Sequence, residues 1–235
     1  MQCVILTGGL GTRLGELTRS IPKAMISFEG KPFLEHQIEC LVRNGVYDVV
    51  LCVGFLSEQI KEYFGTGEQF GVRITYSYET EGLVGTGGAL KKAEPYLYDS
   101  FLVMYGDSYL PISLERVFEV FEKCRYPALM VVYKNRSRFD VSNVIFEDGT
   151  IKMYDKRNPT PEMKYIDYGV SALNKRVVEK HLPKKEFCDL SDLFFRLSRE
   201  EELAGFEVFT RFYEVGSFSG VKDFQLFLRK SRDDC

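Results

Sequence analysis

The feature that most constrains this chain is the stretch LTGGLGTRLGELTRSIPKAM at residues 6–25, where an apolar strand runs directly into a glycine-rich loop. Gly8, Gly9 and Gly11 let the backbone turn through positive φ and approach a ligand closely. Ligands of open α/β sheets bind beyond the carboxyl ends of the strands, which is where this loop lies. Its N–H groups, with the N-terminus of a following helix, suit phosphate oxygens. The stretch therefore predicts a site for a phosphorylated ligand.

Two basic residues strengthen this prediction. Arg13 offers a planar fork of donors for phosphate, and Lys23, directly after Pro22, offers a mobile point charge. The dinucleotide pattern GxGxxG fails because Leu14 stands where glycine or alanine is required, and the P-loop pattern fails because no Gly-Lys-Ser/Thr occurs here. A plain tight turn would explain the glycines but neither of the two cations.

The first half of the chain alternates short apolar runs with helical patterns. Near-continuous Val, Ile and Leu runs are typical of strands buried on both faces of a parallel sheet. Strand–helix–strand units repeated in this way predict an α/β fold with a doubly wound, mostly parallel central sheet. The predicted strands are 3–7, 48–53, 72–77 and 101–106, and the predicted helices are 32–45, 57–65 and 86–97.

The second half is less regular and richer in strands. The run EDG at 147–149 predicts a hairpin turn. No Pro/Gly/Ser-rich linker interrupts the chain, so we expect one domain over 1–235, made of a first half at 1–110 and a second, smaller strand-rich region within 111–235. The predicted strands are 128–133, 142–147, 150–156 and 165–173, and the predicted helices are 176–182, 190–203 and 221–230.

Charge and composition exclude several classes of partner. Lys and Arg total 31 against 34 Asp and Glu, which gives no reason to expect a nucleic-acid or membrane-surface binder. No apolar run approaches the roughly 18 residues needed to span a bilayer, and no signal peptide is evident. We therefore expect a cytoplasmic protein whose six cysteines are free thiols. The sequence leaves open whether the chain forms a homo-oligomer.

Together these motifs resemble the sugar-1-phosphate nucleotidylyltransferases, also called nucleotide-sugar pyrophosphorylases. The signature GG-x-GTRL followed by PK is long and specific, and GTGGAL (85–90), YGDS (105–108), YDK (154–156) and YIDYG (165–169) follow in the family's order. The similarity is greatest to short single-domain members that act on mannose-like, heptose or N-acetylmuramate 1-phosphates. No hexapeptide repeat follows, so we expect no C-terminal β-helix.

The resemblance implies a Rossmann-like nucleotidyltransferase fold and the reaction of an NTP with a sugar 1-phosphate, giving an NDP-sugar and pyrophosphate. Its first half would bind the nucleotide and its second half the sugar. Arg13 would neutralise the leaving pyrophosphate, and Lys23 would draw the phosphates together as charge builds at the α-phosphorus. The nucleotide-binding residues that it implies are Leu6, Gly8, Gly9, Gly11, Thr12, Glu79, Gly85 and Thr86.

Glu79 and Glu81 bear on the choice of nucleobase. A carboxylate can accept hydrogen bonds from guanine N1–H and N2–H₂ together, and guanine alone presents that paired edge. This slightly favours GTP, while two merely exposed glutamates remain an alternative.

On the sugar side, Lys156 matches the family's phosphate-holding lysine, and Asp155 and Asp167 match its sugar-hydroxyl contacts, although the family more often has Glu and Asn there. Asn143 falls near the strand that lines the sugar. These departures leave the sugar open.

Asp107 and Glu214 match the two carboxylates that hold Mg²⁺, the expected cofactor, in the family. Glu214 stands where an aspartate is usual. The alternatives are a helix N-cap for Asp107 and an exposed strand-end glutamate for Glu214.

Two other functions stay open. One is cytidylyl or uridylyl transfer to another small phosphorylated metabolite, whose enzymes share the N-terminal loop. The other is a catalytically silent subunit that binds nucleotide sugars, which the presence of Arg13, Lys23 and Asp107 disfavours.

Overall fold

The structure is a computed structural model that describes residues 1–9, 11–79, 82, 84–184 and 186–233. Its strands are β1 Gln2–Leu6, β2 Ser27–Phe28, β3 Lys31–Pro32, β4 Asp48–Val53, β5 Arg73–Tyr78, β6 Ser100–Tyr105, β7 Ser108–Tyr109, β8 Ala128–Tyr133, β9 Val144–Glu147, β10 Thr150–Tyr154, β11 Ile166–Asn174, β12 Leu203–Val208 and β13 Tyr213–Glu214. Its helices are α1 Phe33–Arg43, α2 Ser57–Phe64, α3 Gly85–Lys92, α4 Leu114–Lys123, α5 Lys175–His181, α6 Leu190–Arg199 and α7 Phe218–Asp233.

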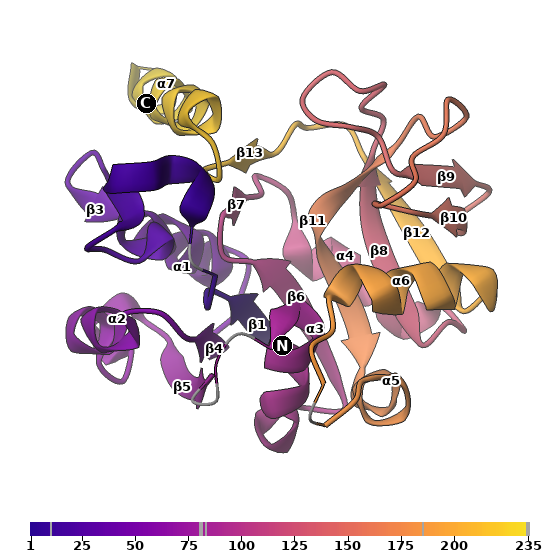
Figure 1. The fold of residues 1–235 in the computed structure, drawn as a ribbon, viewed down its shortest axis with the longest axis horizontal. Helices are drawn as coiled ribbons and strands as arrows, with labels where there is room; N and C mark the ends of the chain where they lie inside the picture. The colour runs from indigo at the N-terminus through magenta and orange to yellow at the C-terminus, as the bar shows by residue number, and fades with distance from the viewer. Residues whose placement is uncertain (10, 80–81, 83, 185, 234–235) are drawn as a thin grey trace.

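A nine-stranded mixed sheet forms the centre of the molecule (Figure 1), with the strand order β5-β4-β1-β6-β11-β8-β12-β10-β9. The first four strands in this order are parallel, as the sequence predicts for the first half. β11 then runs antiparallel to β6 and to β8, and β12 runs parallel to β8. The α/β class and the mostly parallel central sheet are therefore confirmed for the first half, and the second half adds antiparallel pairs.

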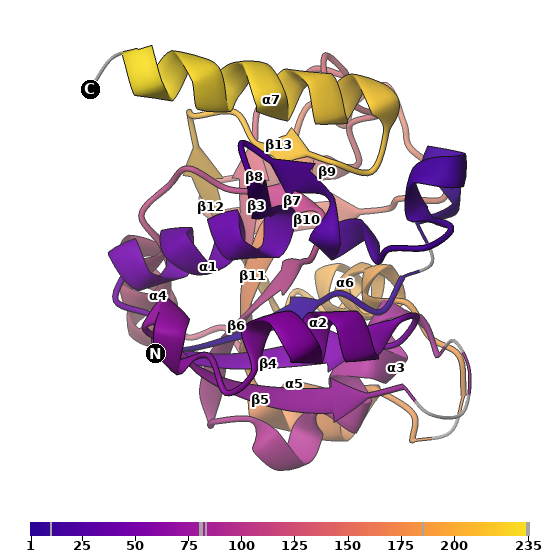
Figure 2. The ribbon, with the colours of Figure 1, turned by 90° about the vertical axis from the view of Figure 1, so that its left-hand side faces the viewer.

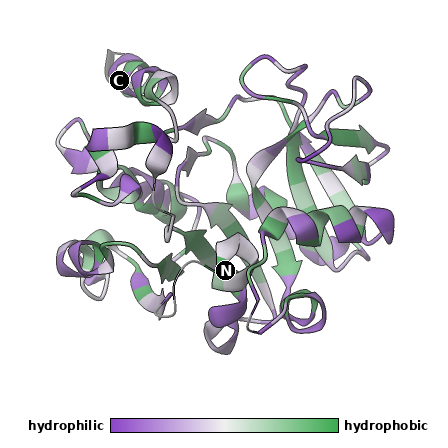
Figure 3. Ribbon diagram, viewed as in Figure 1, coloured by the Kyte–Doolittle hydropathy of each residue, from purple (hydrophilic) through white to green (hydrophobic). Residues whose placement is uncertain are grey.

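Alternate residues of β1 explain why its run is apolar throughout. Cys3 and Ile5 face a core packed against α1, α2 and α4, whereas Val4 and Leu6 face a core packed against α3, α5 and α6. Figure 3 shows the same arrangement, with hydrophobic residues gathered on the central strands. Both faces of the sheet are thus covered by helices, and a strand in this position cannot carry a polar face.

The second half contains the main departures from prediction. The helix expected over 190–203 ends at Arg199, and the residues from Leu203 onward form β12, which the sequence analysis did not predict. Leu203 is fully buried beside β8, so tertiary pairing overrides the helical pattern of the preceding residues. Helix α4 was also missed, although Ser113 accepts a hydrogen bond from the Arg116 N–H as its N-cap.

The hairpin turn predicted over 147–149 is confirmed between β9 and β10. Asp148 and Gly149 both have positive φ, 48° and 76°, as the two central residues of a tight hairpin turn require. The predicted helix 86–97 is shorter than expected, because α3 ends at Lys92 and a separate 3₁₀ turn follows over Glu94–Tyr96.

A small third layer joins the two ends of the chain. The antiparallel pair β7–β13 lies beside the central sheet, and α7 packs its Phe224 against Phe28, Phe33 and Tyr109. Figure 2 shows α7 lying across β13 and above the N-terminal elements. This aromatic cluster fixes β13 near the segment that follows the glycine loop.

The thiols agree with the sequence analysis. Among the described residues, Cys3, Cys40, Cys52, Cys124 and Cys188 are free, and Cys235 lies outside them. Within the same part of the chain, we find no helix that combines the length and the apolar character needed to cross a bilayer.

Candidate active site

The topology brings the predicted site residues to one edge of the sheet. Gly8 follows β1, Glu79 follows β5 and Asp107 follows β6, and these parallel strands share a carboxyl edge. β11 runs the opposite way beside β6, so its first residues, including Asp167, lie at the same edge. Residues far apart in sequence therefore face a common space at the position typical of ligand sites in α/β sheets.

A cavity of about 300 Å³ lies over the glycine loop, and we call it the glycine-loop cavity. Gly11 has a φ of 63°, a left-handed conformation that favours glycine, and a 3₁₀ segment over Thr12–Thr18 follows it. A 3₁₀ segment, which is wound more tightly than an α-helix, therefore stands where the sequence predicted the N-terminus of a helix. The lining residues are Leu6, Gly8, Gly9, Gly11, Thr12, Glu79, Gly85, Thr86, Ala89, Phe187 and Asp189, which include all eight predicted nucleotide-binding residues.

Glu79 lies directly against the loop. A Cβ at Gly8 would overlap the Glu79 carboxylate, so the glycine is what allows this approach. Burial raises the pKa of Glu79, although a backbone hydrogen bond with Val84 and the charge of Lys92 oppose that shift. A partly desolvated carboxylate of this kind is a strong acceptor for paired N–H donors. Glu81 lies outside the described residues.

A second cavity, of about 410 Å³, is lined by Arg13, the residue that follows Thr12 of the first cavity. We call it the Asp107 cavity. Its lining residues are Arg13, Tyr105, Asp107, Ser108, Asp140, Asn143, Lys156, Ile166, Asp167, Tyr168, Gly169, Phe212 and Glu214. The set includes three of the four predicted sugar-side residues and both predicted metal ligands.

Lys23 contacts Asp107 across the site, with 2.7 Å between Nζ and Oδ2. Both side chains are about four-fifths buried, at 19% and 20% exposed. Burial alone would raise the pKa of Asp107, but the Lys23 and Arg13 charges and the Ser108 hydroxyl outweigh it and hold the pKa below its ordinary value. Asp107 is therefore an ionised acceptor near neutral pH.

Glu214 reaches the same place through the β7–β13 pair. Glu214 pairs with Ser108, and the Val215 N–H donates to the Asp107 carbonyl at 2.8 Å. Around the point where a Cβ of Gly216 would stand, Glu214 Oε2 lies at 2.9 Å, Asp107 Oδ2 at 3.3 Å and Arg13 Nη2 at 2.9 Å. Both carboxylate oxygens thus lie within a few ångströms of one point. With ligand bonds of about 2.1 Å, this hard, oxygen-only donor pair fits Mg²⁺.

Asp167 is held in place by its neighbours at the start of β11. Its N–H donates to Asn143 Oδ1 at 3.1 Å, and its Oδ1 accepts from the Gly169 N–H at 2.9 Å. Burial raises its pKa, whereas the Gly169 hydrogen bond and the Lys156 charge act in the opposite direction. The ammonium group of Lys156 lies over the Tyr105 ring, 6.0 Å from its centroid. This part of the cavity wall therefore combines the Lys156 cation with hydrogen-bonding groups.

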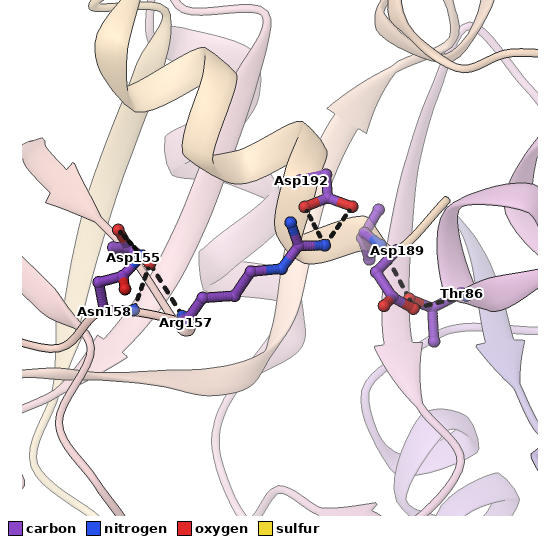
Figure 4. A network of polar contacts seen from close by, with 7 residues as sticks. Thr86, Asp155, Arg157, Asn158, Asp189 and Asp192 are labelled. Atoms are coloured by element: carbon purple, nitrogen blue, oxygen red, sulfur yellow. Dashed lines mark hydrogen bonds and ion pairs between the residues drawn. The ribbon is translucent and has the colours of Figure 1, made fainter. Parts of the chain in front are cut away.

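Asp155 is placed differently from the other predicted sugar-side residues. Its Oδ1 accepts from the N–H groups of Arg157 and Asn158, both at 2.8 Å, and these bonds lower its pKa. Figure 4 shows this turn, with Arg157 reaching across to Asp192 of α6. Asp155 lines a separate, smaller cavity with these residues, so the structure does not bring it to the Asp107 cavity.

Sequence reasoning missed several residues of the two cavities, among them Phe187 and Asp189 in the first and Tyr105 and Asp140 in the second. Asp189 precedes α6 directly, so its only sequence signal is that of an N-cap. Phe187 carries no motif at all, and only the approach of its segment to α3 brings it to the site.

A family profile described as nucleotidyl transferase matches residues 2–231. The chain belongs to this family. Members generally depend on a divalent metal ion, which agrees with a pair of carboxylates beside Arg13 and Lys23.

Individual relatives of this nucleotidyltransferase are similar over most of their length. A D-glycero-alpha-D-manno-heptose 1-phosphate guanylyltransferase of Campylobacter jejuni is 38% identical over 80% of this chain and 82% of its own. One from Aneurinibacillus thermoaerophilus is 30% identical over 92% and 93%. The crystal structure of HddC from Yersinia pseudotuberculosis complexed with GMP-PN has a TM-score of 0.77 and 25% identity, and covers 94% of this chain and 96% of its own.

Proposed function

We propose that this nucleotidyltransferase transfers a guanylyl group from GTP to a sugar 1-phosphate of the manno-heptose type, releasing pyrophosphate. The observation that carries the proposal is the pair of cavities lined by consecutive residues of one loop. The glycine-loop cavity suits a nucleotide, and the Asp107 cavity suits a phosphorylated sugar. A phosphoryl group at their junction would lie among Arg13, Lys23 and Asp107.

The chemistry asks for positioning and charge neutralisation. An oxygen of the sugar phosphate attacks the α-phosphorus of GTP in line, the bond to the bridging oxygen breaks, and pyrophosphate leaves with its electron pair. Arg13 is exposed and would stabilise the leaving group, whereas Lys23 is fixed beside Asp107 at the junction. Neither residue needs to transfer a proton, because both stabilise charge that grows in the transition state.

Asp107 and Glu214 would hold Mg²⁺. When bound, the ion would supply a Lewis-acid charge on the phosphate oxygens. Asp107 is kept ionised by its cationic neighbours, and Glu214 is positioned by the β7–β13 ladder. The aromatic packing of α7 supports that ladder from behind, so the C-terminal helix belongs to the architecture of the site.

Two observations support guanine and a manno-configured sugar. The partly buried Glu79 carboxylate, which lines the glycine-loop cavity, matches the paired donors of guanine. The relatives named as heptose 1-phosphate guanylyltransferases align over at least four-fifths of both chains. On the sugar side, Lys156 would hold the phosphate and Asp167, oriented by Asn143, would accept from a sugar hydroxyl. We leave Asp155 out of this set because its carboxylate closes a turn.

A matrix of substrates tests the proposal. The full-length protein is incubated with Mg²⁺, each of GTP, ATP, UTP, CTP and dTTP, and each of manno-heptose, mannose, glucose and N-acetylmuramate 1-phosphates. Phosphocholine is included as an acceptor that is not a sugar. Pyrophosphate release is measured, with Asp107→Asn as the matched inactive control.

We expect GTP with the manno-heptose 1-phosphate to give the highest kcat/KM, at least about tenfold above UTP or CTP. Uracil and cytosine lack the paired N–H donors of guanine, so they would leave the Glu79 carboxylate without hydrogen bonds. A preference for UTP would contradict the role of Glu79. Turnover with phosphocholine but with none of the sugar 1-phosphates would support a different class of acceptor. Binding of nucleotide without any turnover would support a silent subunit.

A further inference from the structure

Phe187 is an unusual feature of the glycine-loop cavity. It is a large aromatic side chain that lines the cavity and yet is 65% exposed. It comes from the second half of the chain, between α5 and α6, whereas most of the lining comes from the first half. Several other phenylalanines in the described part of the chain are also exposed, but Phe187 is the one among them that lines this cavity, where a ligand could cover its ring.

The backbone on either side of Phe187 is clamped to the start of α3. The Cys188 carbonyl accepts from the N–H groups of Gly87 and Gly88, at 2.9 and 3.2 Å, and the Cys188 N–H donates to the Val84 carbonyl at 3.0 Å. Thr86 Oγ1 accepts from the Leu190 N–H at 2.8 Å. The segment that carries Phe187 is therefore fixed to the GTGGAL motif.

The structure explains why this motif has glycine at 85 and 87, which the sequence alone does not show. A Cβ at Gly85 would overlap the Cys188 carbonyl, and one at Gly87 would stand 2.8 Å from Cys188 Sγ. Gly85 also has a φ of 76°. Both glycines thus admit the segment that carries Phe187, in addition to any approach by the ligand.

We propose that Phe187 stacks on the nucleobase and favours purines over pyrimidines. This role rests on the proposed function, because it needs a nucleotide in the glycine-loop cavity. Leu6 and Ala89 supply an apolar surface in the same cavity, and Phe187 adds an aromatic ring to it. A two-ring base offers a larger face to that ring than a one-ring base does, so stacking strengthens purine binding more. Glu79 would then distinguish guanine from adenine.

Direct binding tests this role without turnover. The dissociation constants of GTP and UTP are measured by calorimetry with Mg²⁺ and no sugar phosphate, for the wild type and for Phe187→Ala, Phe187→Leu and Phe187→Tyr. The matched control is Phe209→Ala, which removes an 84% exposed phenylalanine that does not line the cavity. Circular dichroism checks the fold of each variant.

We expect Phe187→Ala and Phe187→Leu to weaken GTP binding about tenfold and UTP binding about threefold or less, and Phe187→Tyr and Phe209→Ala to bind as the wild type does. Equal losses for GTP and UTP, or full retention by Phe187→Leu, would overturn stacking in favour of simple apolar cover. Unchanged binding by Phe187→Ala would overturn any contact with the base. If the wild type bound no nucleotide, the proposed function itself would fail, and this role would fail with it.

Discussion

The two halves of the molecule build their parts of the site in different ways. In the first half, the glycine-loop cavity is formed largely by backbone and small residues that directly follow parallel strands, such as Gly8 after β1. The second half contributes to the Asp107 cavity through side chains such as Asn143, Lys156 and Asp167, which antiparallel strands and long connections bring together. The first arrangement is local in sequence and the second is not.

Because of this difference, the two halves recognise different parts of the substrates. The N–H groups of a backbone loop, and the cations beside it, recognise phosphate, which every NTP carries. A wall of side chains changes its ligand whenever one residue changes. The comparison therefore predicts that substitutions of the first-half cations reduce turnover with every substrate, whereas second-half substitutions change the KM for the sugar phosphate and not that for GTP.

The largest effect should come from Lys23. Lys23→Ala removes a cation fixed 2.7 Å from Asp107, and we expect kcat to fall by about 10² or more, the scale for one transition-state charge contact. We expect Arg13→Ala to lower kcat by a factor in the same range. Arg19→Ala is the control, because its side chain is 82% exposed and pairs with Glu16. A near wild-type rate for Lys23→Ala, with its circular dichroism unchanged, would remove the basis for assigning turnover to this half.

Glu79 should show opposite effects on binding and stability. Losing a charged acceptor should weaken GTP binding in Glu79→Gln roughly tenfold or more. The pKa of Glu79 is raised in the folded protein, so its ionised form destabilises the fold once pH exceeds the ordinary glutamate value, and fully so above the raised pKa. Glu79→Gln should therefore raise Tm slightly at pH 7 while it weakens GTP binding.

The pH dependence of GTP binding provides a second measurement on the same residue. Wild-type affinity should fall as pH drops through the raised pKa of Glu79, because protonation replaces an acceptor with a donor. The affinity of Glu79→Gln should not change over that interval. Parallel pH profiles for the two proteins would contradict contact between this carboxylate and the base.

Glu214 joins the two halves, because it lies near the C-terminus and meets Asp107 of the first half. Glu214→Gln keeps the shape and removes the charge, so the Mg²⁺ concentration for half-maximal rate should rise about tenfold. Glu119→Gln, on the surface of α4, serves as the control. An unchanged Mg²⁺ titration would leave Glu214 as a structural strand-end residue.

Lys156 should give the smallest effect and the one most specific to the second half. Its side chain is exposed, so Lys156→Ala should raise the KM for sugar phosphate about fivefold and leave the KM for GTP near its original value. Lys152→Ala, on β10 just before Lys156, is the control, and Asp155→Asn should change neither KM because it preserves the turn. Equal rises in both KM values would contradict the division of labour between the halves.

The sequence predicted the first half more accurately than the second because its signals are local. The buried run of β4 was predicted with its observed ends, and every predicted nucleotide-binding residue lines one cavity. β12 was missed because its pairing with β8 depends on residues about 75 positions away rather than on its own pattern. Asp155 matched a motif by position, but the turn that follows it directs its carboxylate elsewhere.

By itself, the sequence determined the α/β class, the glycine loop and the identity of the cations and carboxylates. These features depend on residue type and on short-range spacing. Glycine sets the backbone freedom of the loop, and the spacing of apolar residues sets the strands and helices. The family resemblance had already paired Glu214 with Asp107. Only the tertiary structure decided that Phe187 joins the glycine-loop cavity and that Asp155 leaves the site. Strand pairing and close packing between distant segments set these outcomes, because the partners are joined by no local pattern.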